Sequence, residues 1–169
     1  MAVGIWQKLD QTGRNLLPFA VTVLMMLVAM APTHVPGLAA IAPPLTLISV
    51  FYWAIHRPDL LRPSVVFVLG VLQDLLTGMP LGLSALVFTI AYWVVLTQRR
   101  FFLGNSFLLL WWGFGMVALS AAAIQWAVYS LTFVTVMGVR PAAFQALLAI
   151  AIFPLPAWLL MRLHRAFLS

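Results

Sequence analysis

A carboxylate inside an apolar run is the residue of this chain whose type most clearly suggests chemistry. Asp74 lies within such a run, and the chain has only three acidic residues in all. An ionised aspartate in the middle of a bilayer costs about 2.5–3.5 kcal/mol on insertion scales, so such a residue usually has a partner. Proton transfer, ion passage and substrate binding are the functions that a carboxylate at this depth can serve.

The spacing of glycines around Asp74 indicates a structural role instead. Gly70, Gly78 and Gly82 continue a four-residue spacing through Asp74, which therefore lies about 6 Å from the end of its predicted helix. There its carboxylate can accept hydrogen bonds from amides of the turn at residues 78–82 or from Thr77, or it can reach water. A proton relay needs a second group, and no other carboxylate lies in an apolar run. We favour the structural role over a contact with a partner protein, and that contact over an ion or substrate site.

The remaining polar residues give no catalytic or cofactor motif. Gln73, Gln125 and Gln145 are expected to hydrogen-bond between helices, and we favour this packing role over ligand binding. No serine belongs to a recognisable triad motif, and His34 has no second ligand nearby in the sequence. Without cysteine, disulfides and thiolate metal sites are excluded. We therefore predict no enzyme activity, no metal and no cofactor.

The composition is that of a membrane protein. Hydrophobic residues make up 64% of the 169 residues and charged residues only 7%, against roughly a quarter in soluble domains. Lipid must therefore solvate most of the chain. The net charge of +6 comes from basic residues spread singly or in pairs between apolar runs, which is typical of loops at an anionic membrane surface and not of nucleic-acid binding. The first apolar run leads directly into more apolar sequence, which disfavours a cleaved signal peptide.

Apolar runs and turn residues predict an all-α protein with six transmembrane helices. Residues 1–15 are either a short helix in the headgroup layer or a frayed terminus, residues 16–162 form one transmembrane domain, and residues 163–169 are a tail. Pro18 would lie in the first turn of the first crossing, and Pro154 and Pro156 would kink the last. The predicted crossings are residues 16–31, 38–55, 64–77, 83–97, 107–136 and 141–161.

The distribution of charge sets the expected orientation. In the six-helix arrangement Arg140 lies on one side of the membrane. The other eight lysines and arginines, which lie outside the predicted crossings or at their ends, are all on the opposite side. Positive residues mark the cytoplasmic side, so both termini are expected in the cytoplasm. Those residues are Lys8, Arg14, Arg57, Arg62, Arg99, Arg100, Arg162 and Arg165.

Several residues are candidates for contacts with lipid or protein. Phe51, Tyr52 and Trp53 are expected to form an aromatic belt at the membrane surface. Small residues at four-residue spacing permit close helix packing, so Ala118, Ala122 and the nearby Gln125 are candidate contacts for a partner's helix. Arg57 and Arg62 are topology determinants and headgroup contacts, or they dock a cytoplasmic partner. The sequence does not choose between these two roles.

A stretch of 31 residues resembles a known family. Residues 52–63 (YWAIHRPDLLRP) give an aromatic pair and a polar proline loop, and residues 70–82 (GVLQDLLTGMPLG) give the pattern G-x-x-x-D-x-x-x-G-x-x-x-G. With six predicted crossings, this resembles the bacterial rod-shape-determining membrane protein family MreD. The resemblance implies a non-enzymatic scaffold of the inner membrane that binds the bitopic protein MreC. It also implies work with MreB, RodA and a class B penicillin-binding transpeptidase in peptidoglycan synthesis.

The same family is similar in fold to another class of membrane protein. The substrate-binding subunits of energy-coupling-factor vitamin transporters supply the alternative function, binding of a small molecule for transport. Those subunits commonly carry an alanine-x-x-x-alanine contact in their first helix. Residues 16–31 contain no such pair, which disfavours the transporter alternative.

Overall fold

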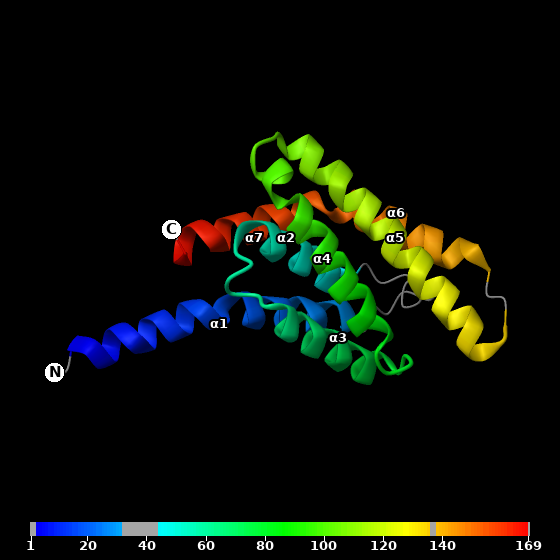
Figure 1. Ribbon diagram of the computed structural model, residues 1–169, viewed down its shortest axis with the longest axis horizontal. Coiled ribbons are helices and arrows are strands. Elements are labelled where there is room, and N and C mark those ends of the chain that lie inside the picture. The colour runs from blue at the N-terminus through cyan, green and yellow to red at the C-terminus, as the bar shows by residue number, and fades with distance from the viewer. Residues whose placement is uncertain (1–2, 32–43, 136–137, 169) are drawn as a thin grey trace.

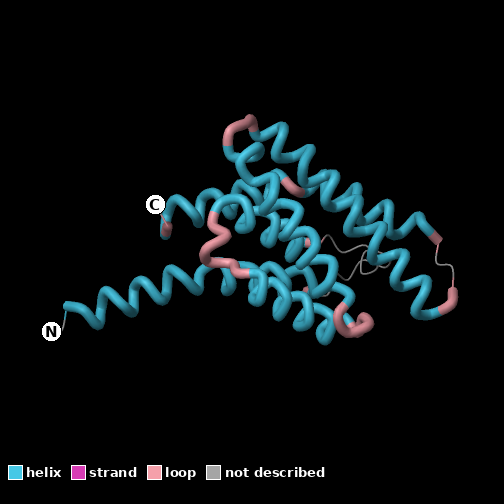
Figure 2. Tube along the Cα trace, in the orientation of Figure 1, coloured by secondary structure: helices cyan, strands magenta, loops and turns pink. Residues whose placement is uncertain are grey.

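The computed structural model describes residues 3–31, 44–135 and 138–168, and within these ranges every regular element is an α-helix (Figures 1 and 2). The predicted all-α class is therefore confirmed for the described part of the chain. The helices are α1 (Val3–Met30), α2 (Leu45–His56), α3 (Pro63–Thr77), α4 (Leu83–Leu103), α5 (Phe107–Phe133), α6 (Val139–Ile152) and α7 (Pro154–Phe167).

Helix α2 lies at the centre of the bundle and forms much of its core. It packs against α1, α4, α5 and α7 (Figure 1). Its twelve residues rise about 18 Å, and every residue from Thr46 to Ile55 is buried. The Phe51 ring makes edge-on contacts with Phe114 at 5.3 Å and with Phe102 and Phe153 at 5.8 and 5.9 Å between ring centroids. This aromatic cluster joins α2 to α4, α5 and the break between α6 and α7.

The expectation of an aromatic belt at residues 51–53 is wrong. Trp53 is fully buried, and Phe51 and Tyr52 are nearly so. The physical reason is the position of α2, because a short helix enclosed by others is apolar on all sides and turns its aromatic rings toward protein. These three residues are core residues and do not face the lipid headgroups.

The first helix is longer than predicted. Helix α1 runs without a break from Val3 to Met30, so Pro18 lies inside it and not in a first turn, and that expectation is wrong. The hydroxyl of Thr22 donates to the carbonyl of Pro18 at 2.7 Å and shares a second 2.7 Å hydrogen bond with Ser49 Oγ on α2. This buried contact joins α1 to the central helix.

Helix α4 continues past the pair of arginines that was expected to follow it. It ends at Leu103, so the predicted end at residue 97 is wrong. Arg99 Nε donates to the carbonyl of Ile55 at 2.6 Å, and Tyr92 Oη donates to the carbonyl of Pro58 at 3.3 Å. Carbonyls at the end of a helix lack helical partners and carry partial negative charge, so a cation is stabilising there. Arg99 therefore fixes the last part of α4 against the end of α2.

The predicted kink near Pro154 is confirmed. Helices α6 and α7 are bent by 46° at Phe153. Proline has no N–H, so Pro154 cannot donate to the carbonyl of Ile150 as a helix would require. The indole Nε1 of Trp111, on α5, donates to that carbonyl at 2.7 Å. A side chain from a neighbouring helix thus satisfies the acceptor that the proline leaves.

The described residues contain three helical segments that are long and apolar enough to cross a membrane, or four if the bent pair α6–α7 is one crossing. Helices α2 and α3 are shorter apolar helices. The prediction of six crossings therefore stays a prediction, and the start of the expected second crossing lies outside the described residues. Both ends of the chain lie on the same side of the bundle, where Arg14 Nε donates to the carbonyl of Phe167 at 2.7 Å (Figure 1).

The hydrogen bond at the α6–α7 break can be tested by substitution of its donor. Trp111→Phe keeps an aromatic ring but leaves the Ile150 carbonyl without the indole donor, so we expect a loss of about 1–2 kcal/mol of stability. The measurement is the melting temperature of the purified protein in mild detergent. Trp112→Phe is the matched control, because the adjacent Trp112 side chain is 70% exposed. Equal melting temperatures for the two variants would show that the indole bond contributes nothing.

Candidate functional site

The Asp74 side chain is fully buried and accepts hydrogen bonds from the backbone of the next helix. Its Oδ2 accepts from the Gly82 N–H at 2.9 Å, and its two oxygens accept from the Ser84 N–H at 3.0 and 3.1 Å. Asp74 lies on α3, whereas Gly82 immediately precedes α4 and Ser84 lies in its first turn. The carboxylate therefore joins two consecutive helices through main-chain amides.

These contacts provide hydrogen-bond acceptors for the first amides of α4. The first amides of a helix have no helical acceptor, and a side chain at the preceding residue usually supplies one. Here that residue is Gly82, which has no side chain, so Asp74 supplies the acceptor from the neighbouring helix. The start of a helix also carries partial positive charge, which stabilises a carboxylate. A buried aspartate is thus accommodated by hydrogen bonds and by the α4 dipole.

The three glycines around Asp74 each have a steric reason. Gly78 has φ +69° and Gly82 has φ +96°, values that other residues rarely adopt. A Cβ on Gly70 would lie 2.2 Å from the Ala85 Cα, so this glycine lets α3 and α4 approach closely. Gly70 and Asp74 are four residues apart and lie on the same face of α3. The whole glycine–aspartate motif therefore shapes the α3–α4 hairpin.

The geometry at Asp74 supports a structural function and shows no catalytic arrangement. The Thr77 hydroxyl, a predicted alternative donor, donates instead to the Gln73 carbonyl at 2.8 Å. No group of three or more His, Cys, Asp or Glu residues in the described ranges could hold a metal ion. Amides of the turn and of the first turn of α4 occupy both carboxylate oxygens.

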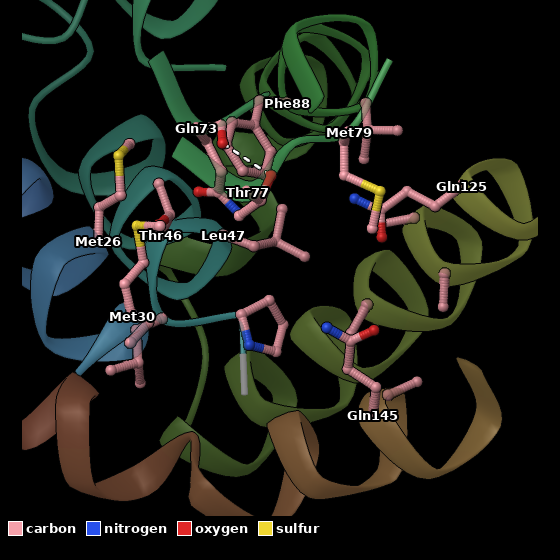
Figure 3. A pocket seen from close by; sticks show the side chains of 18 of the residues that line it. Met26, Met30, Thr46, Leu47, Gln73, Thr77, Met79, Phe88, Gln125 and Gln145 are labelled. Atoms are coloured by element: carbon pink, nitrogen blue, oxygen red, sulfur yellow. Dashed lines mark hydrogen bonds between the residues drawn. The ribbon is translucent and has the colours of Figure 1, made fainter. Parts of the chain in front are cut away.

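A cavity of about 430 Å³ lies next to this hairpin (Figure 3). Gln73 from α3, Gln125 from α5 and Gln145 from α6 all line it. A packing role between helices was predicted for each of the three glutamines, whereas the structure brings them together around one space. The three residues are far apart along the chain, so no spacing signal would have revealed it.

The small residues predicted to contact a partner's helix also line this cavity. Ala118 and Ala122 lie on its wall with Gln125, and Ala118 is only 3% exposed. The surface that α5 leaves exposed carries instead large apolar side chains, among them Trp112 and Met116. A partner helix that packs on the outside of α5 would therefore meet these large residues first.

An apolar groove of about 340 Å³ lies on that outer surface, between α5 and α6. Gly115 lies at its base, where a Cβ would be an ordinary 3.5 Å from Ile150 Cδ1. The groove has almost no polar surface. Its lining residues are Leu108, Trp111, Trp112, Gly115, Met116, Leu119 and Ile150.

The two candidate arginines lie at the ends of the α2–α3 loop. Arg57 directly follows α2, is half-buried, and its carbonyl accepts from the Leu60 N–H at 3.2 Å. Arg62 directly precedes α3 and is exposed. The α2–α3 loop lies on the side of the bundle where the chain termini lie, whereas the α3–α4 turn is at the other end of α3 (Figure 1).

Substitution of Asp74 tests its role at the start of α4. Asp74→Leu leaves the Gly82 and Ser84 amides without their acceptor, so we expect a loss of about 2–4 kcal/mol of stability. Asp74→Asn keeps one acceptor oxygen and is expected to lose about half as much. The measurement is thermal unfolding in detergent. Asp59→Leu removes an exposed carboxylate and serves as the control. If the two variants have the same melting temperature, the capping role of Asp74 is wrong.

Comparison with known protein families identifies the chain. Residues 10–164 match the family of rod shape-determining protein MreD. No curated protein and no solved structure shows a significant match to the chain. The match covers nearly all of the helical bundle, including the Asp74 hairpin, the cavity and the outer groove of α5. The chain therefore belongs to the MreD family of rod shape-determining membrane proteins.

Proposed function

We propose that this protein is a non-enzymatic membrane scaffold of the bacterial cell-elongation complex. It would bind a bitopic MreC-like partner and support lateral peptidoglycan synthesis together with MreB, RodA and a class B penicillin-binding transpeptidase. The family match over residues 10–164 carries the proposal, because it ties almost the whole chain to rod-shape determination. It also favours this function over the transporter alternative.

The proposed scaffold crosses the inner membrane six times, with both termini in the cytoplasm. In this arrangement α2 is a short crossing enclosed by the longer helices, α3 is a short crossing at the edge of the bundle that packs against α4 and α1, and α6 with α7 is one bent crossing. The position of both termini on one side of the bundle supports an even number of crossings (Figure 1). Arg57 and Arg62 lie on that same side, where they would contact anionic headgroups.

The groove on α5 is the surface that we assign to the transmembrane helix of the partner. Helices in lipid associate by close packing, and a small residue in the interface permits that approach. Gly115 supplies it at the base of the groove, while Met116 and Leu119 form exposed apolar walls. A single apolar helix of the MreC type fits this lining, which has almost no polar groups that would need hydrogen bonds.

Filling the groove should weaken the complex. Leu119→Trp places a larger ring in the groove, and we expect partner recovery from membranes to fall about tenfold, which corresponds to about 1.4 kcal/mol. The measurement is co-purification in mild detergent, with recovered proteins identified by mass spectrometry. Leu131→Trp is the matched control on the same helix, because Leu131 is exposed and lies outside the groove. Recovery that stays at the native level with both variants would remove the groove from the interface.

The proposed orientation gives a separate prediction. Green fluorescent protein fused after Ser169 should fluoresce, and alkaline phosphatase fused at the same place should stay inactive, since the C-terminus would be cytoplasmic. Alkaline phosphatase inserted after Gly138, next to Arg140 in the α5–α6 connection, should be active. The opposite pattern at the C-terminus would show that the number of crossings or the orientation is wrong.

A further inference from the structure

We propose that the cavity beside the Asp74 hairpin binds a neutral solute of about sugar size that carries amide and hydroxyl groups. This site goes beyond the scaffold function, which needs no small molecule. Its volume of about 430 Å³ falls within the range of roughly 300–1,000 Å³ typical of small-molecule sites. Figure 3 shows most of its lining side chains, which come from helices α1 to α6 and from the residues that flank them.

The polar groups of the wall define the class of ligand. Gln73, Gln125 and Gln145 bring three carboxamides, each with two N–H donors and an acceptor oxygen. The hydroxyls of Thr46 and Thr77 lie on the same wall. No charged side chain lines the cavity among the described residues. An ionic ligand would lose its hydration without gaining a counter-charge, whereas a neutral donor–acceptor group can pair with these amides.

The apolar part of the wall completes the site. Met26, Met30 and Met79 contribute flexible thioether side chains, which adapt to ligands of irregular shape, and Phe88 contributes an aromatic ring. A solute that turns a ring face or a methyl group toward these residues and its polar edge toward the glutamines would match both surfaces. An N-acylated amino sugar has this combination of groups.

One carboxamide on the wall has an oxygen without a hydrogen-bond donor. Gln73 Oε1 is buried and accepts no hydrogen bond from the described part of the chain. A buried acceptor without a donor costs about 1–3 kcal/mol, so such groups in folded proteins usually have a partner. The oxygen belongs to a residue of the cavity wall but has almost no accessible surface, so the Gln73 carboxamide would turn to present it to an N–H or O–H of a solute in the cavity.

The position of the cavity indicates the side from which the solute would enter. Met79, in the turn of the Asp74 hairpin, and Met30, the last residue of α1, both line it, so it lies at the end of the bundle away from the chain termini (Figure 1). In the orientation proposed above, that end faces the outside of the inner membrane. This statement about the side rests on the proposed orientation, whereas the ligand class does not.

The absence of cysteine in the natural chain allows a direct test. Ala122→Cys places one thiol on the cavity wall, and the rate of its reaction with N-ethylmaleimide is measured on the purified full-length chain in detergent. We expect N-acetylglucosamine to slow the reaction several-fold. Glucosamine, which carries an ammonium group in place of the amide, and N-acetylmuramic acid, which adds a carboxylate, should protect much less, because the wall offers no counter-charge.

Two controls make the result specific. Asn105→Cys lies in the exposed α4–α5 loop, outside the cavity, and its labelling rate should not respond to any of the three sugars. In the Ala122→Cys background, Gln73→Leu should abolish protection by N-acetylglucosamine while the melting temperature stays the same or rises, since it removes an unsatisfied buried oxygen. If that variant does not fold, Gln125→Leu takes its place with the same expectation.

Three outcomes would overturn the inference. They are no protection by N-acetylglucosamine, equal protection by the two charged sugars, and full protection in the folded glutamine variants. The isolated chain is used without any partner, so failure here would leave the scaffold function intact. Conversely, loss of partner recovery on filling the α5 groove would say nothing about the cavity.

Discussion

The hydrogen bonds from the first amides of α4 to the Asp74 carboxylate are the interaction on which the hairpin depends. Lipid offers no water to a helix end, so each backbone polar group at membrane depth must find a partner inside the protein. Gly82 has no side chain to cap α4, and Gly70 allows α3 to bring its carboxylate close enough to do so. The hydrogen bonds that Asp74 accepts from the Gly82 and Ser84 amides thus explain why a carboxylate is present in this apolar run.

The same constraint explains two other contacts of the bundle. Trp111 donates to the carbonyl that Pro154 leaves free in α6, and Arg99 donates to a carbonyl at the end of α2. In each case a side chain of one helix donates a hydrogen bond to a backbone carbonyl that has no helical donor, at the end or at the break of another helix. These contacts allow short and interrupted helices to form a bundle whose centre is α2, a helix with buried side chains on all faces.

The features that could be predicted from the sequence are those that depend on residues close together in the chain. The all-helical class, the turn between Gly78 and Gly82 and the kink at Pro154 follow from residues close together in the chain, and the structure has them. The burial of Trp53 could not be predicted, because an aromatic group at a helix end suits a membrane surface as well as a core. The meeting of Gln73, Gln125 and Gln145 depends on the packing of three helices, so it required the structure.

The cavity and the groove lie on neighbouring faces of the same helix. Ala118 and Ala122 of α5 line the cavity, while Met116 and Leu119 line the groove. The two sites use different side chains of α5, so a substitution such as Leu119→Trp fills the groove without replacing any residue of the cavity wall. One helix can therefore serve a partner helix through one face and a solute through the next, and each function can be tested while the other is left in place.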